Sequence, residues 1–106
     1  MNSSDYGLVA SDLIAILSEL SKNDNIDEVI LFGSRAKGSY HTGSDIDLAL
    51  KGNNIGINDI LDLSIELDKL LLPYKIDLVI YKRIKEKALI EHIDRVGVKL
   101  YQRSNA

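Results

Sequence analysis

The chain has 106 residues, 45% hydrophobic and 27% charged, which suits one soluble globular domain. It contains no cysteine, which excludes disulfides, zinc-thiolate sites and thiol nucleophiles and agrees with a reducing compartment. The net charge of -3 gives no overall attraction to a phosphate backbone, so bulk nucleic-acid binding is not expected. No apolar run approaches membrane-spanning length, and Met1 to Gly7 lacks the features of a secretory signal. We therefore expect one cytoplasmic domain over residues 1–106, without membrane association.

The first third of the chain predicts a helix followed by a strand. From Leu8 to Lys22, apolar residues recur at helical spacing, which indicates an amphipathic helix. Asn23-Asp24-Asn25 breaks this pattern. The apolar run from Glu28 to Phe32 then predicts a buried strand, which ends at Gly33-Ser34.

A second strand is predicted after a polar segment that contains glycine. From Asp45 to Leu50, polar and apolar residues alternate strictly. The alternation places the apolar side chains on one face and both Asp45 and Asp47 on the other.

The segment Ile57–Leu72 predicts a helix, which Pro73 ends. Its apolar positions spread over an arc of roughly 220°, wider than the stripe that covers one sheet. Leu63, Leu67 and Leu70 form the predicted surplus. Two interpretations are open: the helix is wedged between two layers of this chain, or the surplus side contacts a protein partner.

The last third predicts a strand over Lys75–Tyr81, a helix from Lys82 to about Arg95, and a short extended segment over Val98–Tyr101. Helices and strands thus alternate along the chain. This order predicts an α/β (α+β) fold, in which helices flank a small mixed sheet.

Gly33, Ser34 and Arg35 are candidates for binding a phosphate. They follow a strand directly and are expected to open a short helix, whose first backbone N–H groups have no partner within the helix. Gly33 permits close approach, Ser34 offers a hydroxyl, and Arg35 adds positive charge. A Gly-Ser pair after a strand more often forms an ordinary turn. The phosphate-binding interpretation of these three residues therefore depends on the acidic residues described next.

Asp45, Asp47 and Asp77 are the candidate metal ligands. Two carboxylates on one strand face repel each other unless a cation lies between them. Mg²⁺ prefers a few carboxylate oxygens together with phosphates and water, which suits an open strand surface. Asp77 interrupts the apolar run Ile76–Ile80 and completes a three-carboxylate site if the two strands are neighbours. The alternative is that all three are solvated surface acids.

Gly33-Ser34, followed by Asp45-Ile46-Asp47 and by Asp77 in a later apolar strand, resembles the DNA polymerase β-type nucleotidyltransferase superfamily. Within it, the chain is most similar to the minimal nucleotidyltransferase (MNT) proteins of bacteria and archaea. The resemblance covers nearly the whole chain and implies the nucleotidyltransferase fold.

The resemblance also implies roles for these residues. Gly33 and Ser34 would hold the triphosphate of ATP or of another nucleoside triphosphate. Asp45 and Asp47 would bind both of two Mg²⁺ ions, and Asp77 would bind the catalytic ion and help to deprotonate the attacking hydroxyl. All three acids would therefore be catalytic. The implied partner is a HEPN-domain toxin, and a homo-oligomer is compatible with the sequence.

Three functions follow from this resemblance. The first is adenylylation of a tyrosine on a HEPN toxin, which would make the chain an antitoxin and which the complete set of three acids favours. The second is an antitoxin or nucleotide-binding module that neutralises its partner by occlusion, without catalysis. The third is modification of a small molecule of the aminoglycoside type, which the absence of an acceptor domain disfavours. His41 and His92 lack paired ligand spacing and are expected to be solvated or locally hydrogen-bonded.

Overall fold

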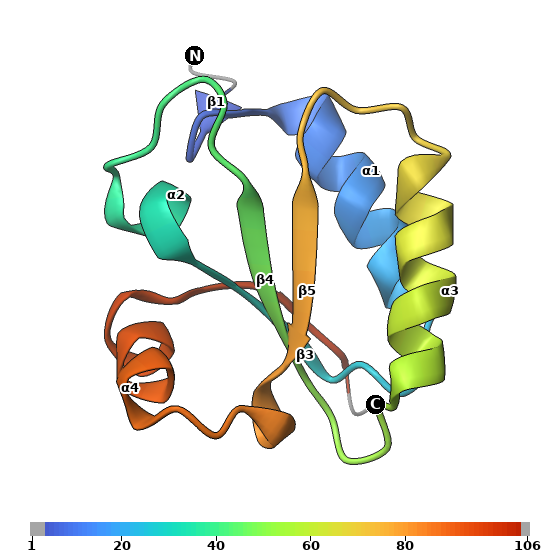
Figure 1. The fold of residues 1–106 in the computed structure, drawn as a ribbon. Coiled ribbons are helices and arrows are strands. Elements are labelled where there is room, and N and C mark those ends of the chain that lie inside the picture. Colours follow the sequence, from blue (N-terminus) through green and yellow to red (C-terminus); the bar gives the residue numbers. More distant parts are fainter. Residues whose placement is uncertain (1–3, 105–106) are drawn as a thin grey trace.

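The computed structural model describes residues 4–104, so the first three residues of Met1–Gly7 lie outside it. Figure 1 shows a central sheet with helices on both sides. The sheet strands are β3 (Glu28–Phe32), β4 (Ile46–Lys51), β5 (Ile76–Ile80) and β6 (Val98–Gln102). The helices are α1 (Ala10–Ser21), α2 (Gly33–Lys37), α3 (Ile57–Asp68) and α4 (Lys87–Val96). The expected α/β (α+β) fold is confirmed.

The four-stranded sheet is mixed, as expected, and has the order β5-β4-β3-β6. Strands β4 and β5 are parallel, and α3 connects them, whereas β3 is antiparallel to both β4 and β6. A parallel pair needs such a crossover because the second strand starts at the same end of the sheet as the first. This order makes β4 and β5 neighbours.

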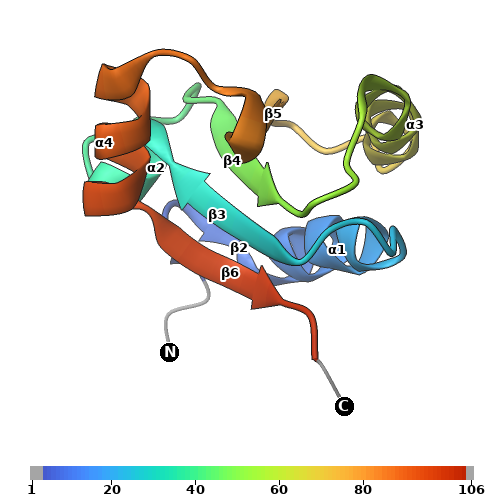
Figure 2. The ribbon, with the colours of Figure 1, turned by 90° about the horizontal axis from the view of Figure 1, so that it is seen from below.

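The helices form a layer on each face of the sheet (Figures 1 and 2). Helices α1 and α3 lie side by side on one face, and α2 and α4 lie on the other. The larger core cluster packs α1 and α3 onto the sheet and includes Ile46, Leu48 and Leu50 of β4. A smaller cluster, with Ile93 of α4 and Ala49 of β4, fills the opposite face. Both faces of β4 are therefore partly covered.

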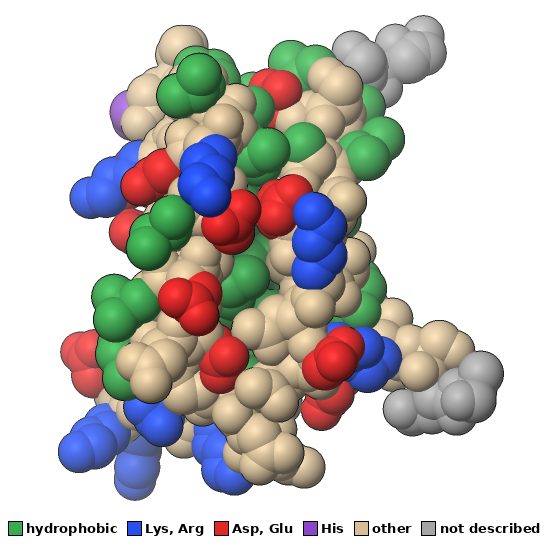
Figure 3. Space-filling view, turned by 90° about the vertical axis from the view of Figure 1, so that its right-hand side faces the viewer, with side chains coloured by type: hydrophobic (Ala, Val, Ile, Leu, Met, Phe, Trp, Pro, Cys, Tyr) green, Lys and Arg blue, Asp and Glu red, His purple; other side chains and the backbone are tan. Residues whose placement is uncertain are grey.

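The exposed side of α3 differs from the predicted one. Leu63 and Leu67 are each only 5% exposed, and Leu70 packs against the larger cluster. The exposed apolar residues of α3, at four-residue spacing, are Ile57, Leu61 and Ile65. The surplus prediction was thus wrong in its residues, because a wide apolar arc does not reveal which of its edges packs on α1 and β5. Figure 3 shows this side of the molecule, where hydrophobic side chains lie among Asp and Glu side chains.

Two helices begin later than the sequence predicts. A hairpin of the two-residue strands β1 (Ser4–Asp5) and β2 (Leu8–Val9) precedes α1, so that helix begins at Ala10. The segment after β5 forms a short 3-10 turn, η1 (Tyr81–Arg83), and α4 begins only at Lys87. Ile84 between them is extended and packs against the smaller core cluster, which a continuous helix from Lys82 would not reproduce.

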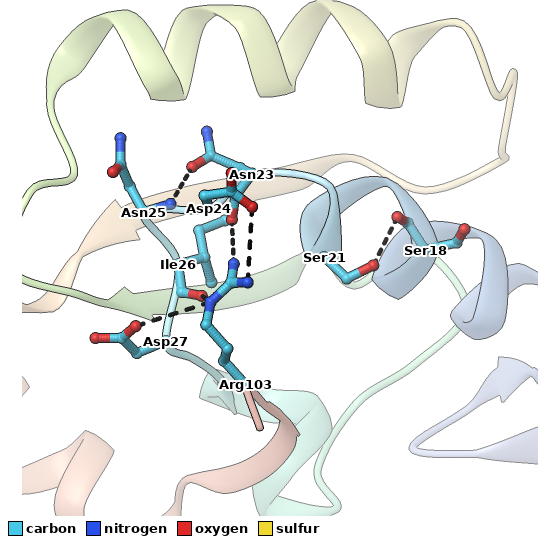
Figure 4. A network of polar contacts seen from close by, with 8 residues as sticks. All are labelled: Ser18, Ser21, Asn23, Asp24, Asn25, Ile26, Asp27 and Arg103. Atoms are coloured by element: carbon cyan, nitrogen blue, oxygen red, sulfur yellow. Dashed lines mark hydrogen bonds and ion pairs between the residues drawn. The ribbon is translucent and has the colours of Figure 1, made fainter. Parts of the chain in front are cut away.

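Arg103 ties the end of β6 to the loop between α1 and β3 (Figure 4). Its Nε donates to the carbonyl of Ile26 at 3.0 Å, and its Nη2 donates to the carbonyl of Asn23 at 2.6 Å. The backbone N–H of Arg103 also donates to the carbonyl of Asp27 at 2.8 Å. These bonds hold the last strand in register at the end of the sheet remote from α2. Within residues 4–104, no helix has the length and apolar character needed to cross a membrane.

Candidate active site

Parallel pairing of β4 and β5 brings two of the predicted acids together. Asp47 and Asp77 are direct partners in this ladder, so their side chains lie on the same face of the sheet. Ile46 and Leu48 are fully buried on the opposite face, and this burial fixes the register that points Asp47 away from the larger core. Asp45 lies one residue before β4.

The three predicted acids form one group, which we call the acid cluster (Asp45, Asp47 and Asp77). Each contributes one carboxylate oxygen, and these oxygens all lie within 4.8 Å of one another. All three residues are half-buried. The structure thus brings together carboxylates from two strands, as the neighbouring-strand hypothesis required.

The Gly33-Ser34 turn lies beside the acid cluster because β3 pairs with β4. Phe32 is the partner of Asp47 in that ladder, and Gly33 follows directly as the first residue of α2. Gly33 has φ of 77°, in the left-handed region, and a side chain added there would overlap the Asp47 carboxylate. Glycine therefore permits both the turn and the close approach of Asp47.

Arg35 is almost fully buried, at 2% exposure, and holds two backbone segments. Its Nε and Nη2 donate to the carbonyl of Ser44 at 3.3 and 2.8 Å, and its Nη1 donates to the carbonyl of Tyr6 at 2.9 Å. The guanidinium carbon lies 5.5 Å from the ring centre of Tyr40 and 5.3 Å from that of Tyr74. Arg35 thus anchors the residue that precedes Asp45. Its predicted contact with nucleotide stays a prediction.

Burial raises the pKa of Asp47 above its ordinary value of 3.8, and the negative charges of Asp77 and Asp45 raise it further, whereas His92 opposes them. Among residues 4–104, the ion pairs of the structure involve none of the three acids. The acid cluster is consequently a concentration of negative charge without a paired protein cation.

Such a donor set fits a hard divalent cation. Mg²⁺ takes oxygen ligands, keeps several waters, and is commonly held by one or two carboxylates together with substrate phosphates. The acid cluster offers oxygens from three carboxylates that are near enough to share one ion, and it stays half open to solvent and phosphate. A bound cation would also relieve the repulsion that raises the pKa of Asp47.

The two histidines have different surroundings. His92 lies on α4, and its Nε2 accepts a hydrogen bond from the backbone N–H of Gly33 at 3.0 Å; it is hydrogen-bonded, but to a residue 59 positions away rather than locally. His41 lies in the exposed loop before β4. Sequence reasoning missed that His92 contacts the Gly33 turn. The sequence carries no signal for this contact, because it joins residues 59 positions apart.

Comparison with known proteins relates the chain to nucleotidyltransferases. Residues 15–106 match the family described as "Polymerase beta, Nucleotidyltransferase". A protein of Methanocaldococcus jannaschii, named "Putative protein adenylyltransferase", is 30% identical over 103 residues. That alignment covers 84% of this chain and 99% of the relative.

Solved structures share the fold. A crystal structure of a toxin-antitoxin with AMP-PNP superposes with a TM-score of 0.70 and 25% identity, covering 86% of this chain and 73% of that one. A second, the tri-AMPylated Shewanella oneidensis HEPN toxin in complex with MNT antitoxin, gives a TM-score of 0.66 and 20% identity, with coverages of 89% and 72%. The second likeness concerns the fold alone.

Proposed function

The chain belongs to the polymerase beta nucleotidyltransferase family, and we propose that it transfers AMP from ATP to a tyrosine of a HEPN-domain toxin, thereby acting as an antitoxin. The observation that carries this proposal is the acid cluster on β4 and β5, beside the Gly33-Ser34 turn. The similarity to a protein named as an adenylyltransferase and to a toxin-antitoxin crystallised with AMP-PNP supports the substrate and the partner.

The residues of the site would divide the work between phosphate and metal. Gly33 and Ser34 would hold the triphosphate: Gly33 lets a phosphate approach the backbone closely, and Ser34 offers its hydroxyl and its backbone N–H, since the N–H of Gly33 already donates to His92. Asp45 and Asp47 would hold two Mg²⁺ ions, and Asp77 would contribute a ligand to one of them. When bound, these cations supply neutralisation of the charge that develops on the entering and leaving oxygens.

The transfer itself exchanges one bond at phosphorus for another. The acceptor tyrosine oxygen forms a bond to the α-phosphorus, and the bond from that phosphorus to the oxygen bridging to the β-phosphate breaks. Pyrophosphate leaves with the bonding electrons. The hydroxyl proton passes to Asp77, which is half-buried at the exposed edge of the sheet, where an acceptor can approach.

Partner binding would use the apolar stripe of α3, formed by Ile57, Leu61 and Ile65. These side chains are 59%, 56% and 54% exposed and lie on one side of the helix. Exposed apolar residues that align in this way are typical of protein contacts. We also propose that residues 1–106 form one domain.

The proposal is tested by incubating the protein with ATP, Mg²⁺ and a purified HEPN-domain protein encoded beside it. Mass spectrometry of the HEPN protein measures AMP on tyrosine, and size-exclusion chromatography measures complex formation separately. We expect AMP addition that requires Mg²⁺. Neutralisation of the toxin without any AMP addition would replace this proposal by the occlusion alternative.

A further inference from the structure

His92 supplies a cap for α2 from a distant part of the chain. Helix α2 has only five residues, and its N-cap, Phe32, offers no side-chain hydrogen bond. The first N–H of the helix, that of Gly33, instead donates to His92 Nε2 at 3.0 Å, across a sequence separation of 59. In this contact the peptide N–H of Gly33 is the donor and Nε2 of His92 is the acceptor.

Two further contacts fix the place of this hydrogen bond. The His92 ring meets the Phe32 ring edge-on, with centres 6.1 Å apart and planes at 79°. Gly33, the donor of this hydrogen bond, also lies close to Asp47: a Cβ added to Gly33 would overlap the Asp47 carboxylate. His92, Gly33 and Asp47 thus form a continuous row from α4 to the acid cluster.

We propose that His92 is a positioning residue for the nucleotide site. Its Nε2 holds the Gly33 peptide in the left-handed conformation. This conformation sets where Ser34 and Asp47 lie relative to each other. A five-residue helix contributes little rigidity of its own, so an outside anchor is needed to keep the phosphate-binding turn against the acids. This inference rests on the proposed function. It adds a residue of α4 to those that position the nucleotide site.

The first test compares two substitutions of His92 with one at His41. His92→Leu removes the acceptor nitrogen at similar volume, and His92→Gln keeps an acceptor oxygen. His41→Leu makes the same chemical change in an exposed loop. We expect His92→Leu to weaken binding of AMP-PNP with Mg²⁺ by about 10- to 100-fold, by analogy with the loss of an outer partner that orients a metal ligand. His92→Gln should recover most of this loss, and His41→Leu should bind like wild type.

The second test observes the hydrogen bond directly. In the nucleotide-free protein, amide hydrogen exchange at Gly33 should be slow in wild type and in His92→Gln, and fast in His92→Leu. The ¹⁵N signal of His92 Nε2 should show a coupling to the Gly33 amide across the hydrogen bond in wild type. Circular dichroism of each variant checks that the fold is retained. If His92→Leu does not fold, His92→Asn, whose shorter side chain does not reach the Gly33 N–H, replaces it in the same measurements.

The outcomes separate this inference from the proposed function. A wild-type protein that binds no AMP-PNP with Mg²⁺ contradicts the proposed function. A wild-type protein that binds it, together with a His92→Leu variant that binds equally well or more tightly, overturns only the positioning role. Tighter binding in that variant would mean that the imidazole competes with phosphate for the Gly33 N–H. Unchanged exchange at Gly33 in His92→Leu overturns the inference in the same way.

Discussion

The Gly33 backbone lies against the carboxylate of Asp47, at the point where β3 leaves the sheet beside β4. In the proposed function, this contact lets the turn that would bind phosphate and the acid that would bind metal face the same substrate. The chain reaches this contact by placing a residue without a side chain next to the acid, in a conformation that L-residues rarely adopt.

Gly33→Ala should therefore impair both stability and ligand binding. The left-handed backbone costs an alanine about 1–2 kcal/mol, and the new methyl group would also displace the Asp47 carboxylate. Gly38→Ala is the matched control, because Gly38 has φ of 85° and nothing within 4 Å of an added Cβ. Urea unfolding should show a lower free energy of unfolding for both variants. Calorimetry with Mg²⁺ and AMP-PNP should show weakened binding for Gly33→Ala alone. Equal binding by the two variants would show that the contact with Asp47 is not needed.

Asp45→Asn, Asp47→Asn and Asp77→Asn, made singly, should each abolish transfer while keeping the fold. Each change is nearly isosteric and removes one anionic ligand from a site where anions repel. Losing the charge stabilisation of a positioned cation costs several kcal/mol of barrier, so we expect transfer to fall by about a thousandfold or more. Asp24→Asn, whose side chain is 96% exposed in the loop between α1 and β3, is the control. A variant of the acid cluster that transfers AMP as fast as Asp24→Asn would remove that acid from the mechanism.

The raised pKa of Asp47 predicts how stability depends on pH. Because burial and the charges of Asp77 and Asp45 raise this pKa above 3.8, the folded state holds the proton more tightly than the unfolded state. The resulting stabilisation is complete below that value and is lost as pH rises through the folded pKa. Without metal, Asp47→Asn should thus have a higher melting temperature than wild type at neutral pH. This difference in melting temperature should shrink as pH falls toward 3.8. A difference that grows on acidification would contradict a raised pKa.

Mg²⁺ should stabilise wild type and leave Asp47→Asn nearly unchanged at neutral pH. Any ligand that binds only the folded state stabilises it, by ~1.4 kcal/mol at about ten times its dissociation constant. Thermal melts with Mg²⁺ and with chelator measure this difference. Equal stabilisation of both proteins would place the cation elsewhere.

Arg35→Met should destabilise the fold more than Lys37→Met, which changes an exposed residue of the same helix. The Arg35 guanidinium satisfies the half-buried carbonyls of Ser44 and Tyr6, and a carbonyl left without a donor costs up to about 1–3 kcal/mol when it is fully buried. Urea unfolding of the two variants makes the comparison. If Arg35→Met instead unfolds like Lys37→Met but loses nucleotide affinity, the direct nucleotide contact predicted for Arg35 would be favoured over the structural role.

The acid cluster could be located from the sequence because each part of it follows from local pattern. Alternation over Asp45–Leu50 puts two carboxylates on one strand face, and Asp77 is the charged residue in an otherwise apolar strand. A single helix between these strands allows them to be neighbours, which the parallel ladder of β4 and β5 bears out. The fold class follows from the same alternation of helices and strands.

The roles of Arg35 and His92 could not be predicted, because their partners are set by tertiary packing. Arg35 contacts Tyr6, which precedes it in the chain, and Ser44, which follows it. His92 contacts Gly33 across a sequence separation of 59. No periodicity marks such pairs. The exposed edge of α3 was missed for a related reason: burial of Leu63 depends on how α3 packs on its neighbours, which hydrophobic spacing alone does not determine.

The central claim is that this chain moves the α-phosphate of ATP by means of the acid cluster, and parallel reactions with ATP labelled at the α- or the γ-phosphate test it most directly. Wild type, Mg²⁺ and the HEPN-domain protein should transfer the α-label to that protein and leave the γ-label in pyrophosphate, and Asp47→Asn should transfer neither. Transfer of the γ-label, or α-label transfer that persists undiminished in Asp47→Asn, would contradict the claim.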